Sequence, residues 1–239
     1  MDRTDHPPDL SQATGRGVGV ALIDSGINAA HSHVGAVAGG VGLWLADDGT
    51  VREDDSYSDQ LGHGTALAGI VRAKAPQAEL YAVRIFSQRL GAPIGLLEAG
   101  LGWAIAHKIK IVNLSLGTNK PEHRARLSRL LEQARAAGCV LVAASPPGRA
   151  DVWPAALPGV IGVAGDERCG WNDYRYASDD PVPFRAHSQP RPLPGLAQER
   201  NFRGHSFASA HVSAVLALLA ETCPQLSSEE ARRFLVRQR

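Results

Sequence analysis

Cysteine is scarce in this sequence, and long apolar runs are absent. The three cysteines, Cys139, Cys169 and Cys223, are unevenly spaced and match no metal-binding pattern, so we expect no disulfide framework and interpret Cys139 and Cys223 as small core residues. No apolar run is long enough to cross a bilayer, and the amino terminus is polar. We therefore expect a cytoplasmic protein that contains no membrane-spanning segment, no metal and no other cofactor.

An excess of charge of either sign is also absent. With 25 basic and 24 acidic side chains the formal net charge is +1, and no long block of like charge occurs, so we expect no nucleic-acid partner. The chain of 239 residues is 44% apolar, which suffices for one substantial core. We expect a single domain over residues 1–239, with a polar lead at 1–16 and an irregular, proline-rich surface loop at 166–203 that carries at most edge strands.

Apolar runs alternate with helical patterns through the rest of the chain. The expected strands cover residues 17–23, 80–86, 109–117, 139–144 and 160–164. The expected helices cover residues 62–71, 95–106, 122–137, 206–219 and 228–236, and a hairpin turn is expected at 47–50. This alternation predicts an α/β fold with a doubly wound, mostly parallel central sheet and helices on both faces.

A serine opens the most suggestive of these helices. Ser206 follows Gly204 and begins a run of small and apolar residues. Its hydroxyl would lie beside free backbone N–H groups at the positive end of the helix dipole, which is a useful place for a nucleophile. The same position is also consistent with the N-cap serine of an ordinary buried helix.

Two other polar residues stand at the ends of apolar segments. Asp24 follows the buried strand at 17–23, and the carboxyl ends of parallel strands form the edge at which open α/β sheets build their sites. His63 stands between Gly62 and Gly64 at the head of a helix, where the glycines would leave room for a substrate backbone. The alternatives are a turn aspartate that caps the next segment and a histidine with a structural role.

Three stretches, around Asp24, His63 and Ser206, follow one another in that order. They cover residues 20–26, 62–69 and 204–212. Together they resemble the three signatures of the subtilisin-like serine proteases, and their order distinguishes them from the chymotrypsin and α/β-hydrolase types. The resemblance implies a subtilisin-like three-layer sandwich and an endopeptidase that forms an acyl-enzyme. Ser206 would attack the substrate carbonyl, His63 would accept and return its proton, and Asp24 would orient the imidazole.

The resemblance extends to residues that would contact the substrate. One expected strand edge consists of Ser115, Leu116 and Gly117, and the opposing edge consists of Leu90, Gly91 and Ala92. Ala144 would line the pocket for the substrate residue before the cleaved bond. A peptide or protein substrate would bind between the two edges as an extended strand. Ordinary strand ends remain the alternative for both segments.

The chain departs from the family at the position of the oxyanion asparagine. Pro147 stands where most subtilases carry an Asn side chain that donates to the oxyanion. Proline has no donor, and loss of that Asn slows turnover about 10²–10³-fold in subtilisin. The remaining candidates are the backbone N–H of Ser206 and the side chains of His205 and Ser145. Our hypothesis is that His205, where the family usually has Thr, replaces part of the missing donor.

Two further features concern calcium and processing. Only residues 72–79 connect the helix after His63 to the next strand, so the calcium-binding loop of secreted relatives is missing and we expect no calcium dependence. We expect neither a signal peptide nor a pro-domain, because only a short polar lead precedes Asp24, and in this the chain resembles compact intracellular subtilases that remove leader peptides. The resemblance implies narrow specificity during maturation of a specific protein or peptide, delivered in a specific protein complex. The alternatives are a catalytically impaired subtilase that acts as a peptide-binding module or chaperone, suggested by Pro147, and a peptide ligase.

Overall fold

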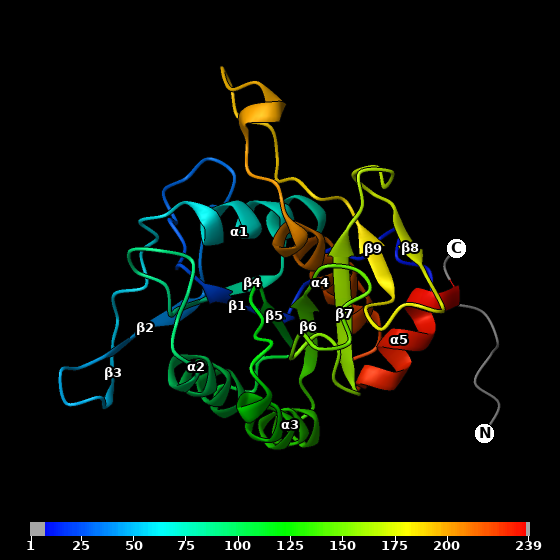
Figure 1. Ribbon diagram of the computed structural model, residues 1–239. Coiled ribbons are helices and arrows are strands. Elements are labelled where there is room, and N and C mark those ends of the chain that lie inside the picture. The colour runs from blue at the N-terminus through cyan, green and yellow to red at the C-terminus, as the bar shows by residue number, and fades with distance from the viewer. Residues whose placement is uncertain (1–7, 238–239) are drawn as a thin grey trace.

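The computed structural model describes residues 8–237, so the first seven residues of the expected polar lead lie outside the described part of the chain. A nine-stranded sheet crosses the molecule in the order β3-β2-β4-β1-β5-β6-β7-β9-β8 (Figure 1). The strands are β1 Gly19–Asp24, β2 Gly39–Leu45, β3 Val51–Asp54, β4 Glu79–Arg84, β5 Ile111–Leu114, β6 Val140–Ala144, β7 Val160–Gly165, β8 Tyr174–Tyr176 and β9 Phe184–Ala186. The pairs β2–β3 and β8–β9 are antiparallel, and the other neighbouring pairs are parallel.

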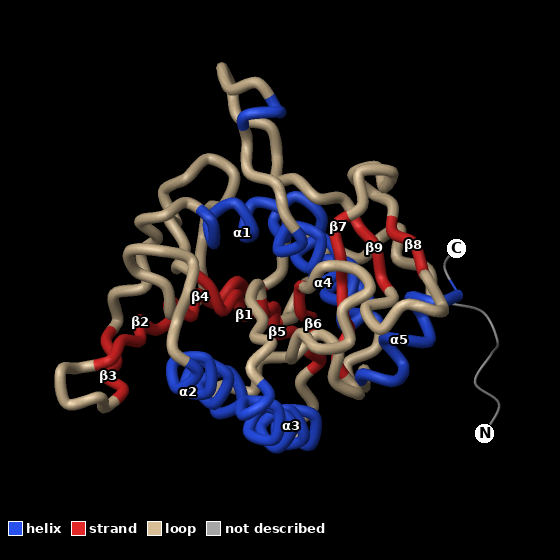
Figure 2. The backbone as a smooth tube through the Cα atoms, in the orientation of Figure 1, coloured by secondary structure: helices blue, strands red, loops and turns tan. Residues whose placement is uncertain are grey.

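Helices cover both faces of the sheet (Figure 2). They are α1 His63–Lys74, α2 Ile94–Ala106, α3 Pro121–Ala136, α4 His205–Thr222 and α5 Ser228–Arg237. Successive residues of β1 enter different cores, since Val20 and Leu22 pack with α1 and α4, whereas Ala21 and Ile23 pack with α2 and α3. This alternation follows from the two-residue period of a strand, and it confirms the doubly wound α/β fold.

The order of strands reverses beside β1. The chain first builds β2, β3 and β4 on one side of β1 and then places β5 on its other side. In open α/β sheets, sites form outside the carboxyl ends of the strands at such a reversal. Asp24, the last residue of β1, therefore lies where a site is expected.

The predicted hairpin turn at 47–50 is confirmed. Ala46 N–H donates to the Thr50 carbonyl at 2.9 Å, and the Asp48 carboxylate accepts from both the N–H and the hydroxyl of Thr50, at 2.9 and 2.6 Å. Strand β5 is shorter than predicted because it ends at Leu114. The next three residues, 115–117, therefore lie just beyond the paired part of the strand.

The prediction of a surface loop at 166–203 is wrong for its middle part. Strand β9 lies between β7 and β8, so it is not an edge strand, and Val182, Phe184 and Ala186 are buried. Prolines exclude long strands here, but Pro183 stands before β9 and leaves its three-residue ladder free to form. Residues 189–203, including the 3-10 turn Gln198–Arg200, project from the body as the orange segment at the top of Figure 1.

Hydrogen bonds hold both ends of the described chain. The Glu221 carboxylate accepts from the backbone N–H groups of Thr14 and Gly15 at 2.7 and 2.6 Å, which ties the lead to α4. A capping box begins α5, since Ser227 Oγ accepts from Glu230 N–H at 3.2 Å while the Glu230 carboxylate accepts from Ser227 N–H at 2.9 Å.

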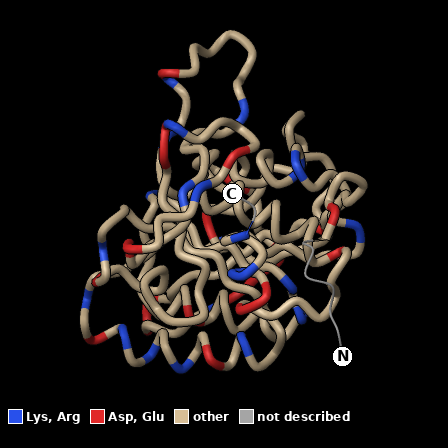
Figure 3. Tube along the Cα trace, turned by 90° about the vertical axis from the view of Figure 1, so that its right-hand side faces the viewer, with Lys and Arg blue, Asp and Glu red and all other residues tan. Residues whose placement is uncertain are grey.

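Charge is distributed evenly over the molecule. In Figure 3 basic and acidic positions are interspersed, and neither sign dominates the view. None of the helices between residues 8 and 237 is long and apolar enough to cross a bilayer. All three cysteines are free; Cys139 and Cys169 are buried, whereas Cys223, expected in the core, is only half-buried.

Candidate active site

Asp24 lies at the carboxyl end of β1 with 1% of its surface exposed. Its Oδ1 accepts hydrogen bonds from the N–H and the hydroxyl of Ser25, at 2.7 and 3.0 Å, and lies 2.8 Å from His63 Nδ1. A carboxylate only accepts, so this contact places the imidazole proton on Nδ1 and leaves Nε2 as the basic nitrogen. The arrangement is that of a histidine prepared to act as a general base.

His63 begins α1, and a second carboxylate fixes the start of that helix. Asp59 accepts from the N–H groups of Leu61 and Gly62 at 2.9 Å, and from the N–H and hydroxyl of Thr65 at 2.8 and 2.6 Å. The sequence alone did not single out Asp59 as a residue of the site.

Two carboxylates also determine the protonation of His63. Burial lowers the pKa of His63, but the hydrogen bond and charge of Asp24, together with the charge of Asp59, outweigh burial and leave that pKa above its usual value. The imidazolium that forms when the base accepts a proton is therefore stabilised by its surroundings.

The glycines beside His63 have roles that differ from the predicted one. A side chain at Gly64 would clash with the Gly26 carbonyl oxygen, so Gly64 lets α1 approach the loop after β1 rather than a substrate. Gly62 has a φ of 79°, the left-handed region that glycine adopts without strain. This close approach allows the Asp24 and His63 side chains to meet.

Ser206 lies in the first turn of α4, directly after the cap residue Gly204 and His205. Its hydroxyl donates to the Ser115 carbonyl oxygen at 3.2 Å, so its hydrogen bond does not go to His63. The neighbouring Phe207 packs against the His63 ring, with ring centroids 5.1 Å apart. The structure thus brings the three predicted residues to one edge of the sheet and joins two of them directly.

A buried polar network lies behind Ser115. Ser213 Oγ on α4 donates to Asn113 Oδ1 at 3.0 Å, and Asn113 Nδ2 donates to Ser115 Oγ at 2.8 Å. Asn113 and Ser213 are fully buried, so each bond replaces hydration that folding removes. Sequence reasoning missed both residues, although polar residues inside apolar runs were a signal.

The two predicted substrate edges differ in their surroundings. Gly117 lies close to Val152 and Ala144, because a Cβ on Gly117 would be 2.7 Å from Val152 Cγ1 and 3.8 Å from the Ala144 carbonyl oxygen. Leu116 is partly buried against the core under α2 and α3. The opposing segment, Leu90 to Ala92, lies in the loop before α2, where Leu90 is 54% exposed. No hydrogen bond in the described part of the chain joins this segment to Asp24, His63 or Ser206.

The oxyanion candidates also differ from one another. His205 Nδ1 accepts from Gly165 N–H at 3.0 Å, which leaves the ring proton on Nε2. Burial and the nearby charge of Arg185 lower the pKa of His205, so its ring is neutral near pH 7. Ser145 Oγ instead donates to the Pro146 carbonyl at 3.1 Å, so its one proton is already used. Pro147 is exposed.

The loop after β6 that carries Pro147 is anchored from a distant part of the sequence. Asp180 accepts from Gly148 N–H at 3.0 Å with both carboxylate oxygens, and it also pairs with Arg185 of β9. The position of this loop therefore depends on the segment that was expected to be a surface loop.

No metal site is evident between residues 8 and 237, where no group of three or more His, Cys, Asp or Glu side chains is arranged to hold an ion. The link between α1 and β4 is short, running from Ala75 to Ala78. The expectation of no calcium dependence stays a prediction.

Comparison with known proteins gives consistent matches. The profile described as the subtilase family matches residues 15–239. The minor extracellular protease Epr of Bacillus subtilis is 34% identical over 241 residues, which cover 93% of this chain and 36% of that protein. The thermostable alkaline protease of Halalkalibacterium halodurans is 29% identical over 92% of this chain and 61% of its own length. The chain thus spans between about a third and three fifths of these two relatives.

Solved structures give the same fold. The crystal structure of a cold-adapted subtilisin-like serine proteinase superimposes with a TM-score of 0.70 over 97% of this chain and 84% of that chain, at 21% identity. The fold is therefore subtilisin-like, with the sheet between two helical layers as predicted.

Proposed function

This chain belongs to the subtilase family, and on that premise we propose that it is a serine endopeptidase in which Asp24, His63 and Ser206 form the catalytic triad. The observation that carries the proposal is the buried 2.8 Å contact between Asp24 Oδ1 and His63 Nδ1, at the sheet edge where α4 presents Ser206. A buried carboxylate–imidazole pair beside a serine at a helix start is the arrangement that activates a hydroxyl.

The chemistry proceeds in two steps. His63 Nε2 takes the proton of Ser206 Oγ as the oxygen attacks the substrate carbonyl, and it returns that proton to the leaving amine. Asp24 stabilises the imidazolium between these transfers. The backbone N–H of Ser206 and the Nε2–H of His205 donate to the oxyanion. In the second step His63 accepts a proton from water as the water attacks the acyl-enzyme, and it returns that proton to Ser206 Oγ as the acid product leaves.

Substrate binding would also release the nucleophile. The Ser206 hydroxyl is bonded to the Ser115 carbonyl at 3.2 Å, and an added strand places its own N–H on that carbonyl. A backbone N–H is a strong donor, so it replaces the hydroxyl there and frees Ser206 to turn towards His63. Activation of the serine is thereby coupled to occupation of the substrate edge.

We infer narrow specificity from two features of the cleft. Pro147 supplies no oxyanion donor, so the rate must depend on favourable binding of a chosen substrate. Val152 fills the space beside Gly117, which favours small side chains before the cut. Both fit removal of a leader from one protein or peptide in the cytoplasm, with the substrate delivered in a specific complex. In its missing oxyanion Asn, the chain also resembles the maturation protease for the small crosslinked subunit of quinohemoprotein amine dehydrogenase.

A second function, peptide binding without cleavage, is favoured by the same Pro147 and by the bond from Ser206 to Ser115. A ligase would use the same acyl-enzyme with an amine in place of water.

Labelling with a fluorophosphonate followed by mass spectrometry tests the proposal. We expect one adduct, on Ser206, that is absent in Ser206→Ala and slowed at least a hundredfold in His63→Ala. Equal labelling of wild type and His63→Ala would contradict the triad and favour the binding module. Capture of a native partner with Ser206→Ala then identifies the substrate.

A further inference from the structure

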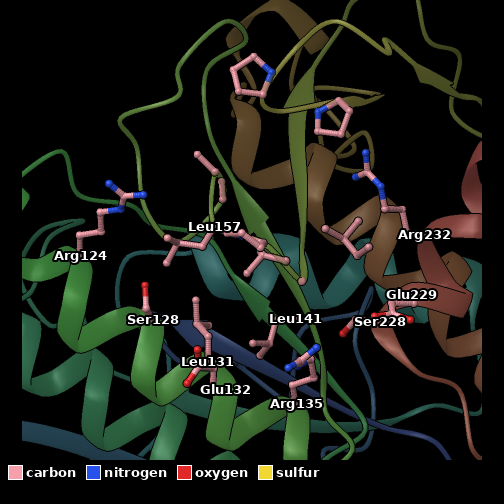
Figure 4. Close-up of a pocket in the computed structure, with 18 of the residues that line it drawn as sticks. Arg124, Ser128, Leu131, Glu132, Arg135, Leu141, Leu157, Ser228, Glu229 and Arg232 are labelled. Atoms are coloured by element: carbon pink, nitrogen blue, oxygen red, sulfur yellow. The ribbon is translucent and has the colours of Figure 1, made fainter.

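A cavity of about 740 Å³ lies away from the candidate active site (Figure 4). It is bounded by α3, α5 and the starts of β6 and β7, where Leu141, Val160 and Ile161 line it. Asp24 ends β1, and β1, β5, β6 and β7 run parallel, so the cavity opens near the amino ends of the strands and the triad lies at their carboxyl ends. Its size is that of a ligand pocket.

The walls combine apolar and charged groups. The apolar part includes Leu131, Leu141, Leu157, Pro158, Pro181 and Pro183. The charged part comprises Arg124, Arg135 and Arg232 with Glu132, Glu229 and Asp180. The charges balance, so the cavity as a whole does not favour a highly charged ligand.

One buried polar atom in the wall has no partner. Ser228 is 4% exposed, and its Oγ forms no hydrogen bond within the described part of the chain. In Figure 4 this hydroxyl points from α5 into the cavity, towards the side lined by Arg135. A buried hydroxyl without a partner is costly, and a ligand oxygen would satisfy it.

The groups around Ser228 favour an anionic oxygen. Arg135 of α3 lines the same cavity, and no ion pair with it occurs among residues 8–237. Ser228 is the first residue of α5, whose Ser227 cap satisfies Glu230 N–H and leaves the N–H groups of Ser228 and Glu229 available. Glu229 is exposed, so its carboxylate can stay in solvent.

The other arginines are already engaged. Arg124 lies over the Trp153 ring at 5.8 Å, and Arg232 lies over the Phe184 ring at 5.6 Å. Asp180 is held by Gly148 and Arg185. Among the described residues that line the cavity, Arg135 is thus the arginine with neither an ion pair nor a ring contact, and Ser228 carries the buried hydroxyl without a partner; together they suit a single carboxylate.

We propose that this cavity binds the C-terminal end of a short apolar peptide, whose carboxylate accepts hydrogen bonds from Arg135 and Ser228 while its side chains pack on the leucine and proline wall. A peptide end supplies one carboxylate on an otherwise uncharged chain, which matches both the single anion position and the balanced charge of the walls. The site does not depend on the proposed hydrolysis.

Calorimetry on the Ser206→Ala protein tests the site without cleavage of the probe. The probes are acetyl-Leu-Leu-Leu with a free carboxyl group and the same peptide as its C-terminal amide. We expect the free acid to bind at least about tenfold more tightly, because a charge-assisted hydrogen bond contributes that much or more. Arg135→Gln should remove this advantage, and Ser228→Ala should weaken binding of the acid several-fold.

Arg129→Gln is the matched control, since Arg129 is exposed on the same helix but does not line this cavity. It should bind like the parent protein. Ser228→Ala removes no hydrogen bond, so it should leave the thermal midpoint unchanged and its binding result interpretable. Equal affinity for acid and amide, no binding of either, or equal effects of Arg135→Gln and Arg129→Gln would each overturn the proposal. Loss of proteolysis in Ser206→Ala has no bearing on it.

Discussion

The hydroxyl of Ser206 donates to the carbonyl oxygen of Ser115 at 3.2 Å, while His63 is bonded to Asp24. The proposed base is therefore oriented before substrate arrives, whereas the proposed nucleophile is held by the edge on which the substrate is expected to lie. Because the Asp24–His63 pair and Ser206 are not bonded to each other, substitutions can test the contribution of each to activity separately.

Asp24→Asn should lower kcat by about 10⁴-fold, as loss of the equivalent aspartate does in serine proteases, because the amide no longer fixes the His63 tautomer. Steady-state kinetics on a cleaved peptide measure this, and KM should change little. Asp47→Asn, an exposed aspartate of the hairpin, is the control and should behave as wild type. A loss below tenfold would remove Asp24 from the mechanism.

The pH dependence should follow His63. The base acts when deprotonated, so kcat/KM should rise with pH through the pKa of His63, which Asp24 and Asp59 hold above its usual value of about 6.5. Asp59→Asn removes one of these charges, so the acidic limb should shift to lower pH. Asp55→Asn makes the same charge change at an exposed position and should shift the limb less. A shift in the opposite direction would contradict the assignment.

His205→Ala should slow acylation at least about tenfold if Nε2–H donates to the oxyanion. Single-turnover rates measure this step directly. His205 also accepts from Gly165, so the thermal midpoint must be measured in parallel. A rate within twofold of wild type would exclude His205 from the mechanism.

Ser213→Ala should destabilise the fold by about 1–3 kcal/mol, because it leaves the buried Asn113 Oδ1 without its donor. Urea unfolding with an unchanged m-value measures the difference. Ser228→Ala is the matched control, since its hydroxyl has no partner to lose. Equal stability of the two variants would show that the network behind Ser115 contributes nothing.

Val152→Ala should widen the pocket before the cut. Its Cγ1 lies 2.7 Å from where a Gly117 side chain would begin, so shortening it leaves space beside that edge. The ratio of kcat/KM for a peptide with Phe before the cut to one with Ala should increase. An unchanged ratio would show that Val152 does not determine which side chain is accepted before the cleaved bond.

The sequence predicted the parts of the fold and site that depend on local pattern. Alternating apolar runs predicted the central strands, and the motifs around Asp24 and His63 predicted two side chains that the structure joins. Asp59 and Ser213 were missed because their roles arise from hydrogen bonds across the fold, which no local pattern contains. Strand β9 was underestimated because prolines around a three-residue ladder hide its alternation. The assignment of Ser206 as nucleophile stays a prediction.

Asp180 gives the proline-rich region a structural role that its composition does not indicate. Its carboxylate accepts from Gly148 N–H, so the turn between β8 and β9 holds the loop that carries Pro147. Exchange of this hairpin between related chains would therefore change how the loop is held, and a truncation there would release the loop while leaving Asp24, His63 and Ser206 in the sequence.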